Sequence, residues 1–147
     1  MVCLGNICRS PLAHGILESK LPEDQFFVDS AGTGNYHIGS PPDHRSIEVA
    51  RRNGINISNQ QCRQFEITDF DLFDIIYVMD TANFSNVVKL ARNPSDIGKV
   101  KLILDSASLN QKEVPDPYYG DMKDFEEVYN LLDKACDSIA LSYENSK

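Results

Sequence analysis

The stretch CLGNICRSP, residues 3–11, leads from a short apolar start into a helical segment and decides the fold of this chain. Ser10 stands at a position typical of a helix cap, and Pro11 follows in the first turn, where the missing N–H of proline removes no hydrogen bond. The pattern predicts a helix over about residues 10–20, preceded by a tight loop. Such a loop directs its N–H groups toward the helix N-terminus, and this arrangement binds anions.

The residues of this loop suit a tetrahedral oxyanion. Gly5 allows a close turn of the backbone, and Asn6 is a residue type that tolerates the left-handed conformation. The planar guanidinium of Arg9 can hold two phosphate oxygens at once, which a lysine cannot reproduce. The aligned amides and Arg9 should stabilise Cys3 as a thiolate, and a thiolate beneath a bound phosphate is a nucleophile.

Ser10 has two interpretations at this point. Its hydroxyl either caps the predicted helix or hydrogen-bonds the Cys3 sulfur, which would ease departure of the thiolate from a phosphocysteine. The predicted phosphate-binding loop comprises Leu4, Gly5, Asn6, Ile7, Cys8, Arg9 and Ser10.

A second candidate site element is VPDPYYG, residues 114–120, just before the last predicted helix. Prolines on both sides stiffen the segment, and Pro117 biases Asp116 toward an extended backbone. An oxygen that leaves phosphorus is better protonated as it departs, so we predict that Asp116 is a general acid that later activates water. The alternative is that Asp116 caps the helix that follows.

Outward from the first loop, predicted strands and helices alternate. Strands are expected at residues 25–30, 74–79 and 101–104, and helices at residues 10–20, 41–53, 81–91 and 121–143. This alternation predicts an α/β fold with right-handed crossovers, a parallel sheet, helices on both faces and a ligand at the carboxyl ends of the strands. Only Met1 and Val2 precede Cys3, so we expect either that the chain begins upstream or that the sheet is incomplete.

Size and composition limit the class of protein. A chain of 147 residues, 41% hydrophobic and 24% charged, predicts one domain over residues 1–147. The net charge of −8 argues against a nucleic-acid partner, because such partners need clustered Lys and Arg. No apolar run reaches the roughly 20 residues that cross a bilayer and no signal peptide is recognisable, so we expect a cytoplasmic protein without a membrane partner.

The four cysteines lack the spacing of metal ligands, and without a secretion signal they are expected to be reduced thiols. Cys62 and Cys136 are predicted to be structural. The three histidines are predicted to be surface residues rather than catalysts: His14, His37 and His44.

Several of these motifs together resemble the low-molecular-weight protein tyrosine phosphatases. The shared stretches follow the family's order and spacing over almost the whole chain: CLGNICRSP at 3–11, DSAGT at 29–33, GSPPD at 39–43, FDIIYVMD at 73–80 and DPYYG at 116–120. The resemblance implies a three-layer, flavodoxin-like fold of the phosphotyrosine protein phosphatase I type, with a four-stranded parallel sheet whose first strand is truncated here. It also implies hydrolysis of a phosphotyrosine-containing protein or a small aryl phosphate, with release of inorganic phosphate and without metal or cofactor.

The resemblance assigns roles to individual residues. Cys3 forms the phosphocysteine, Arg9 and the loop amides bind phosphate, and Asp116 is first acid and then base. Asn6 shapes the loop through a hydrogen bond to Ser30, and Ser10 belongs to the same loop support.

Other implied roles have an alternative beside them. Cys8 either pairs reversibly with Cys3 under peroxide, as the resemblance implies, or is a small buried thiol. Tyr36, Tyr118 and Tyr119 fall where the family lines its cleft with aromatic residues, and stacking on a phenol ring would favour phosphotyrosine over phosphoserine. Each of the three is otherwise an exposed loop tyrosine.

The chain departs from the family in two places. Met1 stands where the family usually has several apolar residues before the valine of the motif. The family also commonly has a histidine in the segment corresponding to residues 58–64, where it braces the loop serine. SNQQCRQ has none, and Gln60 or Gln61 is the predicted substitute.

Two other functions share these features. An arsenate reductase of the same fold uses the same loop but needs two further cysteines close together on a mobile segment, whereas Cys62 stands alone. A phosphotyrosine-binding module without turnover would result if the short first strand left the loop loose.

Overall fold

The computed structural model describes residues 1–145 and has a four-stranded parallel sheet in the order β2-β1-β3-β4. The strands are β1 (Val2–Cys3), β2 (Ala31–Gly32), β3 (Ile76–Val78) and β4 (Val100–Leu102). The helices are α1 (Arg9–Lys20), α2 (His44–Arg52), α3 (Asp69–Leu72), α4 (Thr81–Val88), α5 (Pro94–Gly98) and α6 (Met122–Glu144), with a 3-10 turn η1 at Ile103–Ser106. The predicted α/β class and the four-stranded parallel sheet are confirmed.

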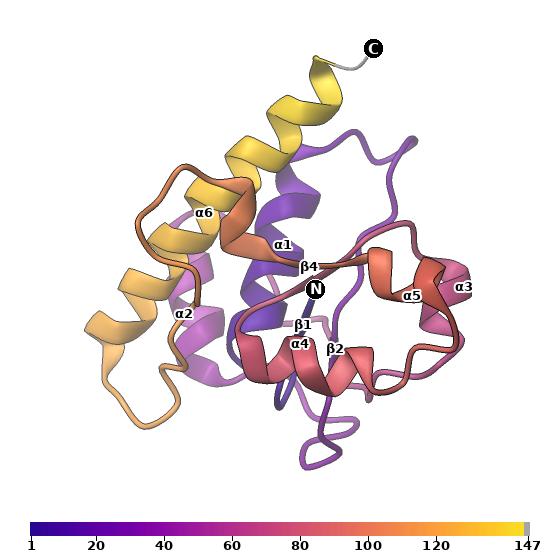
Figure 1. Ribbon diagram of the computed structural model, residues 1–147. Coiled ribbons are helices and arrows are strands. Elements are labelled where there is room, and N and C mark those ends of the chain that lie inside the picture. Colours follow the sequence, from indigo (N-terminus) through magenta and orange to yellow (C-terminus); the bar gives the residue numbers. More distant parts are fainter. Residues whose placement is uncertain (146–147) are drawn as a thin grey trace.

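Helices cover both faces of the sheet and make three layers (Figure 1). Helices α1, α2 and α6 pack together on one face, whereas α3 and α4 belong to the core of the other. The strands supply both cores by simple alternation: Val2 and Val78 face one side, and Cys3 and Met79 face the other. Within residues 1–145, no helix is long and apolar enough to span a membrane.

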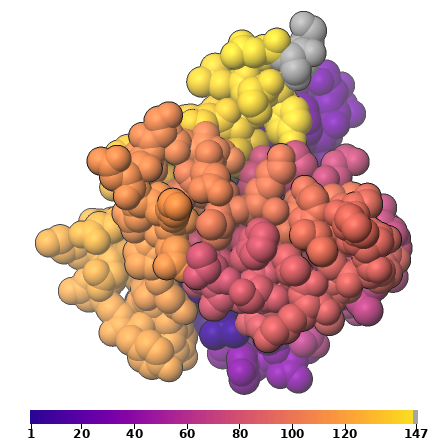
Figure 2. All heavy atoms as spheres, viewed as in Figure 1, coloured from indigo at the N-terminus to yellow at the C-terminus, as the bar shows by residue number. Residues whose placement is uncertain are grey.

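Strand β1 is short but holds a central position. Val2 pairs with Ala31 on one side and with Val78 on the other, and the Ala31 N–H donates to the Met1 carbonyl at 2.9 Å. These bonds place Cys3 at the carboxyl edge of the sheet, where the loop to α1 begins. In the view of Figure 2 the indigo start of the chain is visible only as a small patch in the lower part, beside orange atoms and above purple ones.

The strand predicted over residues 25–30 is wrong: β2 is Ala31–Gly32, immediately after it. A strand needs a neighbour for its N–H and C=O groups, and the regular pairing with β1 begins at Ala31, opposite Val2. The apolar residues FFV do not mark a buried strand here. Phe27 is 77% exposed, and its ring stacks on Phe73 with ring centroids 5.8 Å apart.

Local capping moved other boundaries. The helix predicted from residue 41 begins at His44, because the Asp43 side chain accepts the Arg45 N–H and caps it. It ends as predicted at Asn53 and Gly54, where Gly54 has a φ of +78°. The third predicted helix stops at Val88, and the strand predicted to residue 104 stops at Leu102, where η1 takes over.

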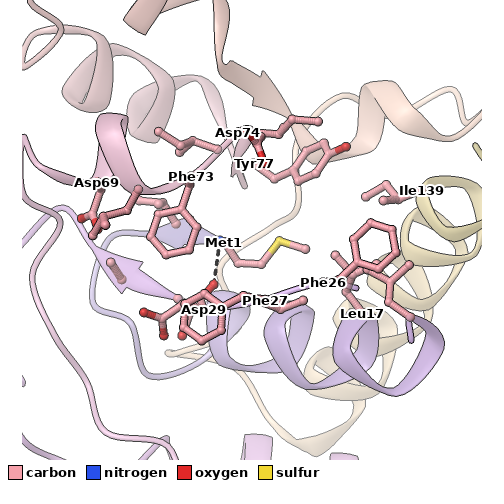
Figure 3. A pocket seen from close by; sticks show the side chains of 18 of the residues that line it. Met1, Leu17, Phe26, Phe27, Asp29, Asp69, Phe73, Asp74, Tyr77 and Ile139 are labelled. Atoms are coloured by element: carbon pink, nitrogen blue, oxygen red, sulfur yellow. Dashed lines mark hydrogen bonds between the residues drawn. The ribbon is translucent and has the colours of Figure 1, made fainter. Parts of the chain in front are cut away.

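A hollow of about 200 Å³ lies at the amino ends of the strands, next to Met1 and to the segment before β3 (Figure 3). Apolar side chains such as Phe26 and Tyr77 form much of its wall. The Met1 ammonium donates to the Asp29 carbonyl at 3.0 Å, and burial lowers the pKa of this ammonium to about 6. This hollow is therefore at the opposite edge of the sheet from the loop that follows Cys3.

Candidate active site

The loop between β1 and α1 presents free amides to one point. Asn6 has a φ of +56°, the left-handed conformation predicted for it. Within the described part of the chain, the N–H groups of Gly5, Ile7 and Cys8 have no hydrogen-bond partner. Cys8, at the N-cap of α1, makes no side-chain cap bond either. Loop and helix end thus offer several donors to an anion.

Cys3 lies at the bottom of this loop and is only 3% exposed. Its Sγ accepts the Asn6 N–H at 3.3 Å and lies 3.1 Å from the Ser10 Oγ. The Ser10 side chain does not cap α1. Of the two roles considered for this hydroxyl, the structure therefore supports the hydrogen bond with the Cys3 sulfur. Hydrogen bonds of this kind stabilise a thiolate more than a thiol.

Arg9 is buried and held from one side. Its Nη1 donates to the Asp80 carboxylate at 2.6 Å and to the Val114 carbonyl at 2.9 Å, while Nη2 lies 3.7 Å from Asp116. Burial by itself lowers the pKa of Arg9, but the facing Cys3 and the bond to Asp80 outweigh it and raise the pKa above its usual range. The guanidinium is therefore a fixed cation, and it lines the same cleft as the loop residues.

Asp80 is a site residue that the sequence interpretation missed. It follows β3, at the carboxyl edge of the sheet, and its other oxygen accepts the Asn83 N–H at the start of α4. The signal was present in FDIIYVMD, since an acidic residue directly after a buried strand lies where ligands bind in such sheets.

Asp116 does not cap the last helix. That position belongs to Asp121, which forms a capping box with Asp124. Asp116 instead accepts the Tyr118 N–H at 3.1 Å, and its half-exposed carboxylate lies opposite Arg9. The structure thus leaves this carboxyl available to a group bound over Cys3.

A cleft of about 400 Å³ brings the predicted residues together. Its lining is Cys3, Leu4, Gly5, Ile7, Cys8, Arg9, Tyr36, His37, Asp116, Tyr118 and Tyr119. The buried Cys3 forms the floor, and Tyr36 and Tyr119, 71% and 95% exposed, stand at the rim. His37 was expected to be merely a surface residue, yet it lies against the loop, and a Cβ on Gly5 would come within 3.3 Å of its ring.

A buried polar network supports the loop. The Asn6 Nδ2 donates to Ser10 Oγ at 2.8 Å and to Ser30 Oγ at 3.0 Å, so the predicted bond between Asn6 and Ser30 is present. The expectation that His14 is a surface residue is wrong: its side chain is 12% exposed, and its Nδ1 lies 3.2 Å from Ser30 Oγ.

Gln60 and Gln61 do not brace the loop serine. The Gln60 amide donates to the Pro11 carbonyl at 3.1 Å, and within residues 1–145 neither glutamine hydrogen-bonds Ser10 or Ser30. The prediction of a bracing glutamine is therefore wrong, because the Gln60 amide is used by the backbone of α1.

Arg45, also missed by the sequence interpretation, ties α2 to the segment that carries Asp116. It donates to the Tyr118 carbonyl at 2.9 Å and to the Gly120 carbonyl at 3.0 Å. Its own position is fixed by two bonds to the Asp43 carboxylate and by the Phe125 ring, whose centroid is 4.5 Å away. A sequence pattern gives no hint of it, because the partners are carbonyls far along the chain.

The four cysteines are buried free thiols. Burial raises the pKa of Cys8, and it raises those of Cys62 and Cys136 to about 11 and about 12, so these three favour the thiol form. Pairing of Cys8 with Cys3 under peroxide stays a prediction. Among residues 1–145, no group of three or more His, Cys, Asp or Glu side chains could hold a metal ion.

Comparison with known proteins agrees with this geometry. Residues 1–146 match the family described as low molecular weight phosphotyrosine protein phosphatase. A putative low molecular weight protein-tyrosine-phosphatase of Synechocystis is 41% identical over 96% of this chain and 92% of its own. The fold matches a protein tyrosine phosphatase of Entamoeba histolytica, with Hepes in its active site, at a TM-score of 0.92 and 33% identity, covering 99% and 95% of the two chains. It also matches Vibrio vulnificus Wzb in complex with benzylphosphonate at a TM-score of 0.86 and 33% identity, covering 96% and 94%.

Proposed function

This chain belongs to the low molecular weight phosphotyrosine protein phosphatase family, and from that premise we propose that it hydrolyses phosphotyrosine through a phosphocysteine on Cys3. One observation carries the mechanism: a thiol, a fixed guanidinium and a half-exposed carboxyl from three separate segments line one cleft around a loop of free amides. Each component has a distinct task in a displacement at phosphorus.

In the first step the loop amides and Arg9 bind the phosphate oxygens, and the Cys3 thiolate attacks phosphorus from below. The bond between phosphorus and the phenolic oxygen breaks as the sulfur–phosphorus bond forms. Asp116, which supplies the proton, converts the departing oxygen into a neutral phenol.

In the second step Asp116, now a carboxylate, takes a proton from water, and the water oxygen attacks phosphorus. The sulfur–phosphorus bond breaks, inorganic phosphate forms and Cys3 returns to a thiolate. The Ser10 hydroxyl, 3.1 Å from the sulfur, stabilises that thiolate as it leaves.

The cleft also supports selection of aryl phosphates. Because Cys3 is buried, a phosphate must reach down to it, and the tyrosines at the rim offer aromatic faces to a phenol ring. The Vibrio relative holds benzylphosphonate, an aromatic group on phosphorus, which supports the same substrate class here. A net charge of −8 would repel an acidic substrate at long range, so recognition depends on these local donors.

Hydrolysis of p-nitrophenyl phosphate and of a matched pair of peptides, one with phosphotyrosine and one with phosphoserine, tests the proposal. We expect turnover of the aryl ester and the phosphotyrosyl peptide, inhibition by vanadate, and little release from the phosphoseryl peptide. Binding of the phosphotyrosyl peptide without release of phosphate would identify a binding module instead. Arsenate-dependent formation of a disulfide would indicate a reductase.

The link from Arg45 to the Asp116 segment gives a first quantitative prediction. Arg45→Lys keeps the charge but cannot contact both carbonyls in the same geometry, so Asp116 should be less well placed. We expect kcat for p-nitrophenyl phosphate to fall about fivefold to tenfold, corresponding to one or two lost hydrogen bonds, with KM nearly unchanged.

Arg51→Lys is the matched control, because Arg51 lies on the same helix and, among residues 1–145, its ion-pair partner is the half-buried Glu48. Equal kcat values for Arg45→Lys and Arg51→Lys would contradict the proposed positioning role of Arg45.

A further inference from the structure

We propose that His14, on α1, is a positioning residue for the nucleophile loop, acting through Ser30 and Asn6. It accepts a hydrogen bond from the Ser30 hydroxyl and so completes a buried network of hydrogen bonds, another branch of which ends on the Cys3 sulfur. The kinetic consequence rests on the proposed function, whereas the effect on the sulfur does not.

The direction of these hydrogen bonds is set by a backbone amide. The Arg63 N–H donates to Asn6 Oδ1 at 3.0 Å, so this oxygen is identified as the acceptor and the Asn6 amide cannot be reversed. Its NH₂ group must then donate both of its protons, and it donates them to Ser10 and Ser30. Both serine oxygens are therefore acceptors toward Asn6.

A hydroxyl that accepts from Asn6 must place its own proton elsewhere. The acceptor nearest to the Ser10 hydroxyl is the Cys3 sulfur at 3.1 Å, because the alternative, the Ala31 carbonyl, is 3.5 Å away. For the Ser30 hydroxyl, the acceptor within the described residues is His14 Nδ1 at 3.2 Å. Every donor in the network then has an acceptor.

His14 can accept at Nδ1 only when its proton is on Nε2. The Nε2 atom faces the Glu18 carboxylate one turn along α1, at 3.3 Å, which favours that tautomer. Burial lowers the pKa of His14, against the pull of Glu18, so the ring is neutral and can accept. The Asp29 carboxylate raises the pKa of the same ring, whereas the Met1 ammonium lowers it.

The burial of the network makes its completeness important. Asn6, Ser10 and Ser30 are 2%, 0% and 5% exposed, so water does not readily replace a lost partner. A buried donor left without an acceptor costs more than the net contribution of an ordinary hydrogen bond. Without His14, the Ser30 hydroxyl would compete for the existing acceptors or turn away from Asn6, and the loop would lose its fixed form.

Two substitutions separate the nitrogen atoms of His14. In His14→Asn the amide oxygen can take the place of Nδ1 and accept from Ser30, whereas in His14→Gln the amide reaches the place of Nε2 and leaves Ser30 without its acceptor. We expect His14→Asn to retain kcat within about twofold and His14→Gln to lose about threefold to tenfold, as for one buried hydrogen bond, with KM nearly constant. The rate of Cys3 alkylation by iodoacetamide below neutral pH should fall in parallel.

Three further measurements make the test decisive. His44→Gln, at a 91% exposed side chain, should alter neither rate, and thermal unfolding shows whether each variant is folded. In a Ser30→Ala background, His14→Gln should have no further effect. Equal rates for His14→Asn and His14→Gln, or an undiminished effect without the Ser30 hydroxyl, would overturn the proposal. A wild-type chain that lacks phosphatase activity would refute the proposed function. The rate of Cys3 alkylation in the variants would still test the role of the contact between His14 and Ser30.

Discussion

Cys3→Ser should reduce hydrolysis of p-nitrophenyl phosphate by more than about 10⁴-fold, as expected when the nucleophile of a covalent mechanism is removed. A serine hydroxyl in the same loop stays protonated near neutral pH, because the loop amides and Arg9 cannot lower its much higher proton affinity enough. The cradle itself should remain, since the Asn6 and Ser10 contacts need only a small polar atom at this place. Calorimetric binding of phosphate or vanadate to the variant checks that point.

Two matched variants identify the nucleophile. Cys136→Ser changes a buried thiol in the α6 core, away from the cleft, and should keep activity within a few-fold apart from some loss of stability. Cys8→Ser tests the other thiol of the loop. If Cys8→Ser lost turnover and Cys3→Ser kept it, Cys8 would be identified as the nucleophile and the proposed mechanism would be wrong.

Asp116→Asn should slow the first step, release of the phenol, by about 10²- to 10³-fold for phenyl phosphate and by much less for p-nitrophenyl phosphate, whereas loss of the base should slow the second step equally for both. The reason is the leaving group: p-nitrophenolate is a stable anion that can depart without a proton, whereas phenolate is better expelled as phenol. Asparagine keeps the shape and the bond from the Tyr118 N–H but carries no acidic proton.

A series of aryl phosphates measures this effect as a slope. In the variant, the logarithm of kcat/KM, which reports the first step, should depend steeply on the basicity of the leaving phenol, and in the wild-type chain only weakly. Asp121→Asn is the control, because it alters a neighbouring carboxylate that caps α6 and does not line the cleft. Parallel slopes for Asp116→Asn and the wild-type chain would exclude Asp116 as the acid.

The strand order explains why these groups meet. In the order β2-β1-β3-β4 the chain leaves β1 and β3 toward opposite faces, so a crevice opens at their carboxyl ends. Cys3 ends β1, and Asp80 follows β3 to hold Arg9 across the crevice. The Val114 N–H donates to the Met79 carbonyl at 2.8 Å, which brings the following Asp116 to the same edge.

The sequence by itself determined the chemistry of the loop. Spacing fixed the order of thiol, turn, cation and helix start in residues 3–11, because all of these lie within one local segment whose conformation follows from Gly5, Asn6 and the helix. The alternation of apolar segments was enough for the α/β class and the parallel sheet, although local caps and partners moved the boundaries of the elements.

Only the tertiary structure decided which distant groups serve that loop. Ser10 contacts sulfur rather than capping α1, and Asp116 faces Arg9 rather than capping α6. His14 on α1 contacts Ser30, whereas the sequence predicts a brace from Gln60 or Gln61. A hydroxyl, a carboxyl or an imidazole can satisfy its hydrogen bonds with many partners, and local sequence does not choose among them. Packing of helices and strands sets which partners lie within about 3 Å, and burial then makes those bonds obligatory.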